Sequence, residues 1–172
     1  MRVISGKYKG RILEGFNING TRPTMDRVKE SMFAVIQNNL KDKVILDLFA
    51  GSGSLGIEAL SNGAKICYFV DNNKIAINAI KKNTIGIDNK VIIKKDCFEA
   101  LKDFDIKFDV ILLDPPYHDN LMDKVLEKIE EYDLLNEDGI IVCEIEEEFK
   151  TTYKIKKEKK YGNKKVYVLT NN

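Results

Sequence analysis

The chain has 172 residues, of which 44% are hydrophobic and 32% are charged. These values exclude a disordered polymer and indicate one globular domain that buries a core of its own. No run approaches the roughly 18 apolar residues of a membrane span, and the first twenty residues hold no apolar segment typical of a signal peptide. With three widely spaced cysteines and one histidine, we expect reduced thiols, a cytoplasmic protein and no metal site.

The net charge of +1 conceals an uneven distribution of charged residues. Residues 1–45 carry a net charge of +5, residues 46–149 carry −11, and residues 150–172 carry +7. An acidic body with basic ends favours a polyanionic partner held by the ends, although lysine-rich ends can also be merely solvated. Charge alone leaves both interpretations open.

The first forty residues are predicted to form an extension before the main body. Met1–Phe16 indicates a short basic hairpin. Thr24 can cap a helix that runs to about Asn39, with Asp26 in its first turn, where the helix dipole favours an anion. We expect one domain in all, with the extension at 1–40 and the main body at 41–172.

Short apolar runs alternate with amphipathic stretches between residues 43 and 145. Near-continuous apolar strands that alternate with helices predict a parallel sheet covered on both faces, with ligands at the carboxyl ends of the strands. The fold class is therefore α/β and doubly wound. The predicted strands are Lys43–Phe49, Lys65–Val70, Val91–Ile93, Phe108–Leu113 and Gly139–Ile145, and the predicted helices are Gly56–Asn62, Asn73–Ile85, Cys97–Asp103 and Asp119–Tyr132.

The residues after 150 predict two further strands. Thr151–Glu158 and Lys164–Thr170 are expected to pair antiparallel through a turn at Tyr161-Gly162-Asn163. They would complete a mostly parallel sheet of seven strands.

A glycine-rich segment, DLFAGSGSLG at residues 47–56, joins the first predicted strand to a helix. Its G-x-G-x-x-G pattern is used by both dinucleotide sites and S-adenosylmethionine sites, because glycine lets the backbone turn tightly and approach a ligand. Asp47 discriminates between them. A pyrophosphate at a helix N-terminus disfavours a nearby negative charge, whereas the cationic amino-acid end of S-adenosylmethionine can use one. The segment therefore favours S-adenosylmethionine.

Acids also follow the second and third predicted strands. Asp71 can accept both hydroxyls of a ribose, or cap the helix after it, or do both. Asp96 can accept the amino group of adenine, and the backbone N–H of Cys97 can donate to the ring. These positions fit the nucleoside part of the same cofactor.

The fourth predicted strand ends in Asp114-Pro115-Pro116-Tyr117. A base amine is a poor nucleophile because its lone pair is delocalised into the ring, so acceptors aimed at its two N–H groups favour attack and stabilise the developing positive charge. The Asp114 carboxylate is one acceptor and a carbonyl of the proline pair is the second, held in place because proline fixes φ. Tyr117 can stack on a base swung out of its helix, a contact of about 1–3 kcal/mol. The segment therefore indicates methyl transfer to an exocyclic amine.

Together these residues resemble a known family, the bacterial methyltransferases that modify the exocyclic N2 of a guanine in small-subunit (16S) ribosomal RNA (RsmD-like). The resemblance covers nearly the whole chain. RVISGKYKGR at residues 2–11 is similar to the family's basic start, and TRPTMDRVKESMFAVI at residues 21–36 is similar to its most specific segment. DLFAGSGSLGIEAL and DPPY fit its cofactor and catalytic motifs, which other amino-methyltransferases share.

The resemblance implies a Rossmann-like class I fold, S-adenosylmethionine as cofactor, and ribosomal RNA, within an assembling small subunit, as partner of a monomeric enzyme. One departure is Asp71, where the family more often has glutamate. The shorter acid would need a water molecule or a closer backbone to reach the ribose. The implied cofactor contacts are Asp47, Phe49, Ala50, Gly51, Ser52, Gly53, Asp71, Asn72, Asp96, Cys97 and Thr24. The implied amine-positioning residues are Asp114, Pro115, Pro116 and Tyr117, and the implied RNA contacts are Arg2, Lys7, Lys9, Arg11, Arg22 and Arg27.

Three alternatives stay open at this point. An amino-methyltransferase acting on DNA adenine or on a protein glutamine uses a similar motif, commonly with asparagine in the place of Asp114. A nicotinamide-dependent oxidoreductase would use the glycine loop for pyrophosphate, but no suitably placed Lys–Tyr pair or histidine supports hydride chemistry. The third is an RNA-binding module without catalytic activity.

Overall fold

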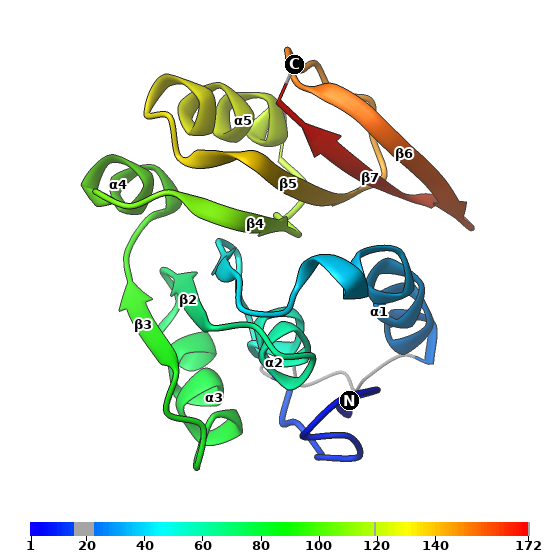
Figure 1. The fold of residues 1–172 in the computed structure, drawn as a ribbon, viewed down its shortest axis with the longest axis vertical. Coiled ribbons are helices and arrows are strands. Elements are labelled where there is room, and N and C mark those ends of the chain that lie inside the picture. Colours follow the sequence, from blue (N-terminus) through cyan, green and yellow to red (C-terminus); the bar gives the residue numbers. More distant parts are fainter. Residues whose placement is uncertain (16–22, 119, 172) are drawn as a thin grey trace.

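The computed structural model of the chain describes residues 1–15, 23–118 and 120–171, without the side chains of residues 23–25. Within these ranges, strands and helices alternate and form one seven-stranded sheet flanked by helices (Figure 1). The strands are β1 (Val44–Asp47), β2 (Ile66–Asp71), β3 (Lys90–Lys94), β4 (Phe108–Leu113), β5 (Leu135–Ile145), β6 (Lys154–Tyr161) and β7 (Lys164–Thr170). The helices are α1 (Pro23–Ile36), the 3-10 helix η1 (Gln37–Asn39), α2 (Ser54–Ser61), α3 (Lys74–Asn83), α4 (Cys97–Asp103) and α5 (Leu121–Glu131).

The sheet has the strand order β3-β2-β1-β4-β5-β7-β6. Strands β1 to β5 run parallel, whereas β7 lies antiparallel between β5 and β6. The chain order reverses at β1, because β2 pairs with one edge of this strand and β4 with the other. Ligands of open α/β sheets bind at the carboxyl ends of the strands at such a reversal. The predicted α/β class and mostly parallel sheet are confirmed.

Helices cover both faces of the sheet. Val28 of α1, Ile57 of α2 and Ile80 of α3 are buried in one apolar cluster, whereas Leu101 of α4 and Val125 of α5 are buried in a second cluster on the other face. Within the described residues, no helix has the length and apolar character needed to cross a membrane. The apolar spacing i, i+3, i+4, i+7 explains how α5 packs, because it places on one side the buried residues Met122, Val125, Leu126 and Ile129.

Several predicted element ends are wrong. Helix α1 begins at Pro23, so Thr24 lies inside the first turn instead of capping it; proline suits the first helical position because its missing N–H would have no partner there. Strand β5 begins at Leu135, four residues before the predicted Gly139, because its polar start continues past an irregularity in the pairing with β4. Strand β6 begins at Lys154 instead of Thr151. The predicted helix start at Asp119 lies outside the described residues, and α5 begins at Leu121.

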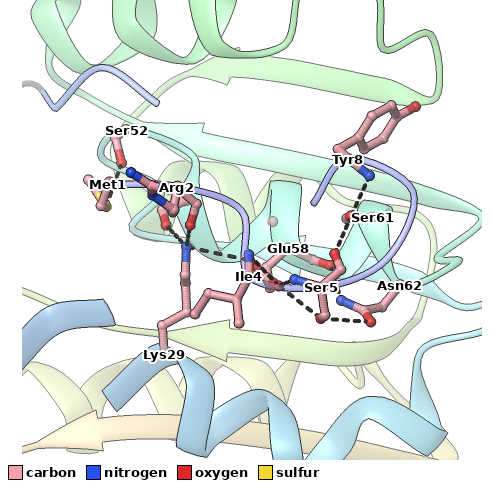
Figure 2. A network of polar contacts seen from close by, with 12 residues as sticks. Met1, Arg2, Ile4, Ser5, Tyr8, Lys29, Ser52, Glu58, Ser61 and Asn62 are labelled. Atoms are coloured by element: carbon pink, nitrogen blue, oxygen red, sulfur yellow. Dashed lines mark hydrogen bonds and ion pairs between the residues drawn. The ribbon is translucent and has the colours of Figure 1, made fainter. Parts of the chain in front are cut away.

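The predicted hairpin at Met1–Phe16 is reduced to a single antiparallel bridge between Arg2 and Ile12 in the part that the structure describes. The segment keeps backbone hydrogen bonds of its own, such as the one from the Val3 N–H to the Arg11 carbonyl oxygen at 2.9 Å, and it also bonds to α2. The Glu58 carboxylate accepts hydrogen bonds from the backbone N–H groups of Ile4 and Ser5 at 3.0–3.2 Å (Figure 2). The segment is thus held against the helix that follows the glycine loop.

Lys29 of α1 completes this network. Its ammonium donates to the carbonyl oxygen of Arg2 at 2.8 Å and to Ser54 Oγ at 2.9 Å, and its Nζ lies 3.4 Å from Glu58 Oε2 (Figure 2). Lys29 and Glu58 are both buried, and buried charges need such partners to offset the loss of water. The N-terminal segment, α1 and α2 are therefore joined by one polar network beside the glycine loop.

Candidate active site

Acidic side chains stand at the carboxyl ends of four neighbouring strands. Asp71 ends β2 and Asp47 ends β1. Asp114 directly follows β4, and Glu144 is the last residue but one of β5. We call these four residues the acid row.

The pairing register places the acid row on one face of the sheet. Asp47 pairs with Phe69 of β2 and with Leu112 of β4, and Leu112 pairs with Val142 of β5. The other three acids each lie two residues beyond one of these partners, and side chains two residues apart along a strand share a face. Phe69, Leu112 and Val142 belong to the apolar cluster beneath α1, α2 and α3. The acid row therefore lines the end of this face, next to the start of α2.

Asp47 is the most deeply buried member of the acid row, with an exposed fraction of 1%. Its Oδ2 accepts the backbone N–H of Gly56 at 2.9 Å. Burial raises the pKa of Asp47 to about 7; the Gly56 hydrogen bond opposes this, and the charges of Asp114 and Asp71 add to it. A bound cation would favour the ionised form of this carboxyl.

The glycine loop turns sharply between β1 and α2. Gly51 has φ 56° and Gly53 has φ 82°, values that glycine adopts without the steric cost that other residues incur. Gly56 has another role, because a Cβ at this position would lie 2.3 Å from the ring of Phe69. The first two glycines thus shape the turn, and the third lets α2 pack closely on β2.

The remaining loop residues fix the loop to the sheet. Ala50 is buried, and its N–H donates to the carbonyl oxygen of Val70 at 3.0 Å. The carbonyl oxygen of Ser52 accepts from Asn83 Nδ2 of α3 at 2.9 Å, and Phe49 packs against the cluster on the opposite face. All the predicted loop contacts thus lie in one rigid turn.

Asp71 anchors the glycine loop to β2. Its Oδ2 accepts the N–H of Gly51 and its Oδ1 accepts the N–H of Asn73, both at 2.9 Å. The alternative that Asp71 caps the next helix is wrong, because Asn73 caps α3 by accepting the N–H of Ile75. Asn72 lies exposed beside them. Asp71 is half-buried and each of its oxygens keeps acceptor capacity toward a ligand.

Asp96 caps α4 at the end of β3. Its Oδ1 accepts the N–H groups of Phe98 and Glu99 at 2.9 and 3.3 Å, which leaves Oδ2 outside these bonds. Cys97 is half-buried, and burial raises the pKa of its thiol to about 11, so it stays neutral. These residues lie at the carboxyl end of β3, at the same end of the sheet as the glycine loop.

The Asp114–Tyr117 turn lies beside Asp47, at the end of β4. Asp114 is half-buried and Pro115 buried, whereas Pro116 and Tyr117 are exposed. Burial raises the pKa of Asp114 to about 7, the charge of Glu144 adds to this, and the charge of Lys164 opposes it. The Tyr117 hydroxyl donates to Glu146 Oε1 at 2.9 Å, and its exposed fraction of 53% leaves the ring accessible. The turn thus presents a carboxylate and an aromatic ring at one place.

Three of the predicted RNA contacts meet at one cavity of about 320 Å³. Arg2, Lys9 and Arg27 line it together with the acids Asp26 and Glu30. This cavity adjoins the polar network of Figure 2, because the carbonyl oxygen of Arg2 bonds Lys29, which also bonds the start of α2.

Two further predicted RNA contacts lie elsewhere. The charged groups of Lys7 and Arg11 lie 5.4 and 5.6 Å from the ring centre of Tyr8, and the Arg11 guanidinium donates to the carbonyl oxygen of Ile85. Arg22 and the side chain of Thr24 lie outside what the structure describes.

Comparison with known proteins identifies the family. Residues 1–170 match the family described as Conserved hypothetical protein 95. The chain belongs to this family. Its relatives include ribosomal RNA small subunit methyltransferase D of Haemophilus influenzae, with 37% identity over 86% of this chain and 80% of that protein. YlbH of Bacillus subtilis, named an rRNA methyltransferase, is 44% identical over 86% of this chain and 84% of that protein.

Solved structures agree with this family membership. The chain superposes on yhhF of Escherichia coli, described as a methyltransferase, with a TM-score of 0.88 and 26% identity over 100% of this chain and 98% of that one. The family resemblance and the class of enzyme predicted from the sequence are therefore confirmed: the protein is a methyltransferase with the Rossmann-like fold.

Sequence reasoning missed the charged neighbours of the Asp114–Tyr117 turn. Glu144 belongs to β5, Glu146 to the segment after it, and Lys164 to β7. Their importance depends on the pairing between strands, which the sequence does not specify. The buried Lys29–Glu58 pair was missed because it depends on how the helices α1 and α2 pack against each other. A signal for Glu144 was present, since an acid at the end of an otherwise apolar strand is costly to bury without a partner. Among the described residues, no cluster of three or more potential metal ligands occurs.

Proposed function

We propose that this methyltransferase uses S-adenosylmethionine to methylate the exocyclic N2 of a guanine in small-subunit ribosomal RNA. The observation that carries the proposal is the position of the Asp114–Tyr117 turn beside the acid row and the glycine loop. The names of the relatives, which describe rRNA methyltransferases, support RNA as the substrate.

The acid row fits a cationic cofactor better than an anionic one. Asp47 and Asp71 stand beside the glycine loop, where a pyrophosphate would meet two negative charges. When bound, S-adenosylmethionine supplies an electrophilic methyl carbon on a positively charged sulfur. Asp47 would hold the amino-acid end of this cofactor, Asp71 the ribose, and Asp96 with Cys97 the adenine.

Asp114 and the proline carbonyls are suited to hold a base amine. The carboxylate accepts one N–H of the amine and a carbonyl accepts the other, which favours the pyramidal nitrogen needed for attack and stabilises its developing positive charge. Proline contributes no N–H that would compete for these acceptors. The exposed ring of Tyr117 offers a face on which the base can stack.

The lysine-rich edge strand β6 also favours a polyanionic substrate. Strand β6 forms an edge of the sheet and carries five exposed lysines. Some lysines elsewhere pair with acids, as in Lys82–Glu14 and Lys95–Asp103, whereas the described contacts include no ion pair for any of these five. Lysines on an edge strand also hinder pairing with another chain, and five exposed ones on a single strand favour phosphate binding. The five are Lys154, Lys156, Lys157, Lys159 and Lys160.

A methyl-transfer assay tests the proposal. The protein is incubated with S-adenosylmethionine labelled in its methyl group and with unmethylated small-subunit rRNA, free or assembled with ribosomal proteins. Parallel reactions contain DNA or protein extract. We expect label in rRNA alone. Label in DNA or protein, or none in either rRNA preparation, would contradict the proposal.

A further inference from the structure

The pairing of β5 with β7 brings a lysine to the end of the acid row. Glu144 pairs with Val166 and Ile145 pairs with Lys165, so the next position along β7, Lys164, lies opposite Glu146. Val166 is buried in the same apolar cluster as Val142, and side chains alternate between faces along a strand. Lys164 therefore points to the face that carries the acid row, whereas Lys165 points to the other.

Contacts agree with this placement. The Lys164 ammonium forms an ion pair with Glu144 Oε1. The exposed fractions of the two side chains are 29% and 9%, so water screens this pair less than it screens the surface pairs. The same ammonium interacts electrostatically with the Asp114 carboxylate and the Tyr117 hydroxyl. One cation thus reaches both polar side chains of the predicted amine-binding turn.

We propose that Lys164 is a positioning residue of the methyl-transfer site, which keeps the Asp114 carboxylate ionised and holds Tyr117 beside it. This inference rests on the proposed function, because it assigns Asp114 the task of accepting an N–H of the substrate amine. Only the ionised carboxylate is an acceptor at both of its oxygens.

The charges around Asp114 explain why a cation is needed. Asp47 faces it from β1 and Glu144 faces it from β5, whereas Lys164 faces it from β7. The two neighbouring acids disfavour a third negative charge in a partly buried place, and the ammonium favours it. With its pKa at about 7, Asp114 is poised where a change in one neighbour alters its ionisation under physiological conditions.

The test is the pH dependence of methyl transfer by a Lys164→Met variant. A rise of one unit in the pKa of Asp114, from about 7, lowers its ionised fraction at pH 7 roughly fivefold. We expect kcat/KM to fall by about that factor or more at pH 7, and to recover toward the wild-type value at pH 9. Lys164→Arg, which retains the charge, should keep the wild-type profile. Lys165→Met is the matched control, because Lys165 points to the other face and pairs with Glu158.

Glu144 provides a second measurement that does not depend on the stability of the lysine variant. Glu144→Gln removes a charge that opposes ionisation of Asp114. The acidic limb of the plot of kcat/KM against pH should therefore move to lower pH in this variant. The pH profile of kcat/KM for the double variant Glu144→Gln/Lys164→Met should lie between the profiles of the two single variants. An equal loss at every pH in Lys164→Met, or unmoved profiles in both single variants, would overturn the inference. Wild-type protein that transfers no methyl to RNA would contradict the proposed function instead.

Discussion

Lys29 and Glu58 form an ion pair in the interior, with Nζ 3.4 Å from Oε2 and exposed fractions of 4% and 0%. The pair connects α1 to α2, and Glu58 also binds the backbone of Ile4 and Ser5. Burial lowers the pKa of Lys29, although Glu58 and Asp26 act in the opposite direction. The ammonium is therefore tolerated inside the protein because of the partners arranged around it.

Replacing Lys29 by Met should destabilise the protein strongly. The variant leaves the Glu58 carboxylate buried without its cation, a change that costs about 3–5 kcal/mol in comparable sites. Urea unfolding followed by circular dichroism measures the loss. Lys128→Met is the control, because the pair of Lys128 with Glu131 is exposed and its loss should leave the midpoint nearly unchanged. Equal midpoints for the two variants would show that the buried pair does not hold α1 in place.

Asp47 should make cofactor binding depend on pH. Its pKa is raised to about 7 in the free protein, and a cationic ligand favours the ionised carboxylate. The affinity for S-adenosylhomocysteine, which retains the ammonium group, should therefore rise as the pH increases from 5.5 to 7 and level off above. Calorimetry should show a slope approaching tenfold per pH unit below 7.

Asp47→Asn should bind more weakly and lose this slope, because the amide does not titrate. Asp88→Asn is the control, since Asp88 is exposed and precedes β3 at the amino ends of the strands. A slope that persists in Asp47→Asn would assign the titration to another group.

Replacing Asp114 by Ala should strongly slow methyl transfer while cofactor binding survives. Loss of one preorganised partner of a developing charge typically costs about 10²- to 10³-fold in rate. Single-turnover kinetics measures the rate, and calorimetry with S-adenosylhomocysteine measures cofactor affinity. This affinity should change no more than about threefold if Asp114 contacts only the substrate and not the cofactor. If cofactor affinity collapsed as well, Asp114 would have a structural or cofactor-binding role instead.

Gly56→Ala should destabilise the fold although alanine favours helices. The added Cβ would lie 2.3 Å from the ring of Phe69 and 2.7 Å from the sulfur of Cys67, and overpacking of this kind costs about 1–3 kcal/mol. This exceeds the gain of roughly 0.5–1 kcal/mol expected for Gly to Ala in a helix. Thermal unfolding should show a lower Tm. A second substitution, Phe69→Leu, should recover part of the loss, and no recovery would mean that the strain lies elsewhere.

The lysines of β6 should contribute to RNA affinity through charge. Lys157 and Lys159 pair with Val168 and Val166, so they share a face with Lys164 and the acid row. In the double variant Lys157→Gln/Lys159→Gln, the slope of log affinity against log salt should become shallower by about 0.7 for each lysine that contacts phosphate of single-stranded RNA. Filter binding at several salt concentrations measures the slope.

The control for this experiment is Lys43→Gln/Lys65→Gln. Both control lysines are exposed. Lys43 directly precedes β1 and Lys65 directly precedes β2, at the end of the sheet opposite the acid row. Identical slopes for the two double variants would assign the β6 lysines to edge protection alone.

The mostly parallel sheet could be predicted, although its strand order was not, because each buried strand is a nearly unbroken apolar run, followed by an acid or a glycine where the chain leaves the sheet. Asp47, Asp71 and Asp114 were recognised for this reason. Strand ends were less predictable, because the polar start of β5, at Leu135–Asp138, pairs with β4 only through tertiary contacts.

Contacts between distant residues could not be predicted from the sequence. The partnership of Lys164 with Glu144 depends on the register of β7 against β5, and that of Lys29 with Glu58 depends on how α1 crosses α2. Local chemistry also misled at one position: both Asp71 and Asn73 can cap a helix, and the backbone geometry selects Asn73 while Asp71 binds the loop.

The most direct test of the central claim is the identity of the methylated nucleoside. Small-subunit rRNA that has been incubated with the protein and S-adenosylmethionine is digested to nucleosides and analysed by mass spectrometry against standards. The account predicts N2-methylguanosine, formed by wild-type protein and formed at least about 10²-fold more slowly by Asp114→Ala. A methyl group on a ring carbon, on a ribose hydroxyl or on the amine of adenine would contradict it.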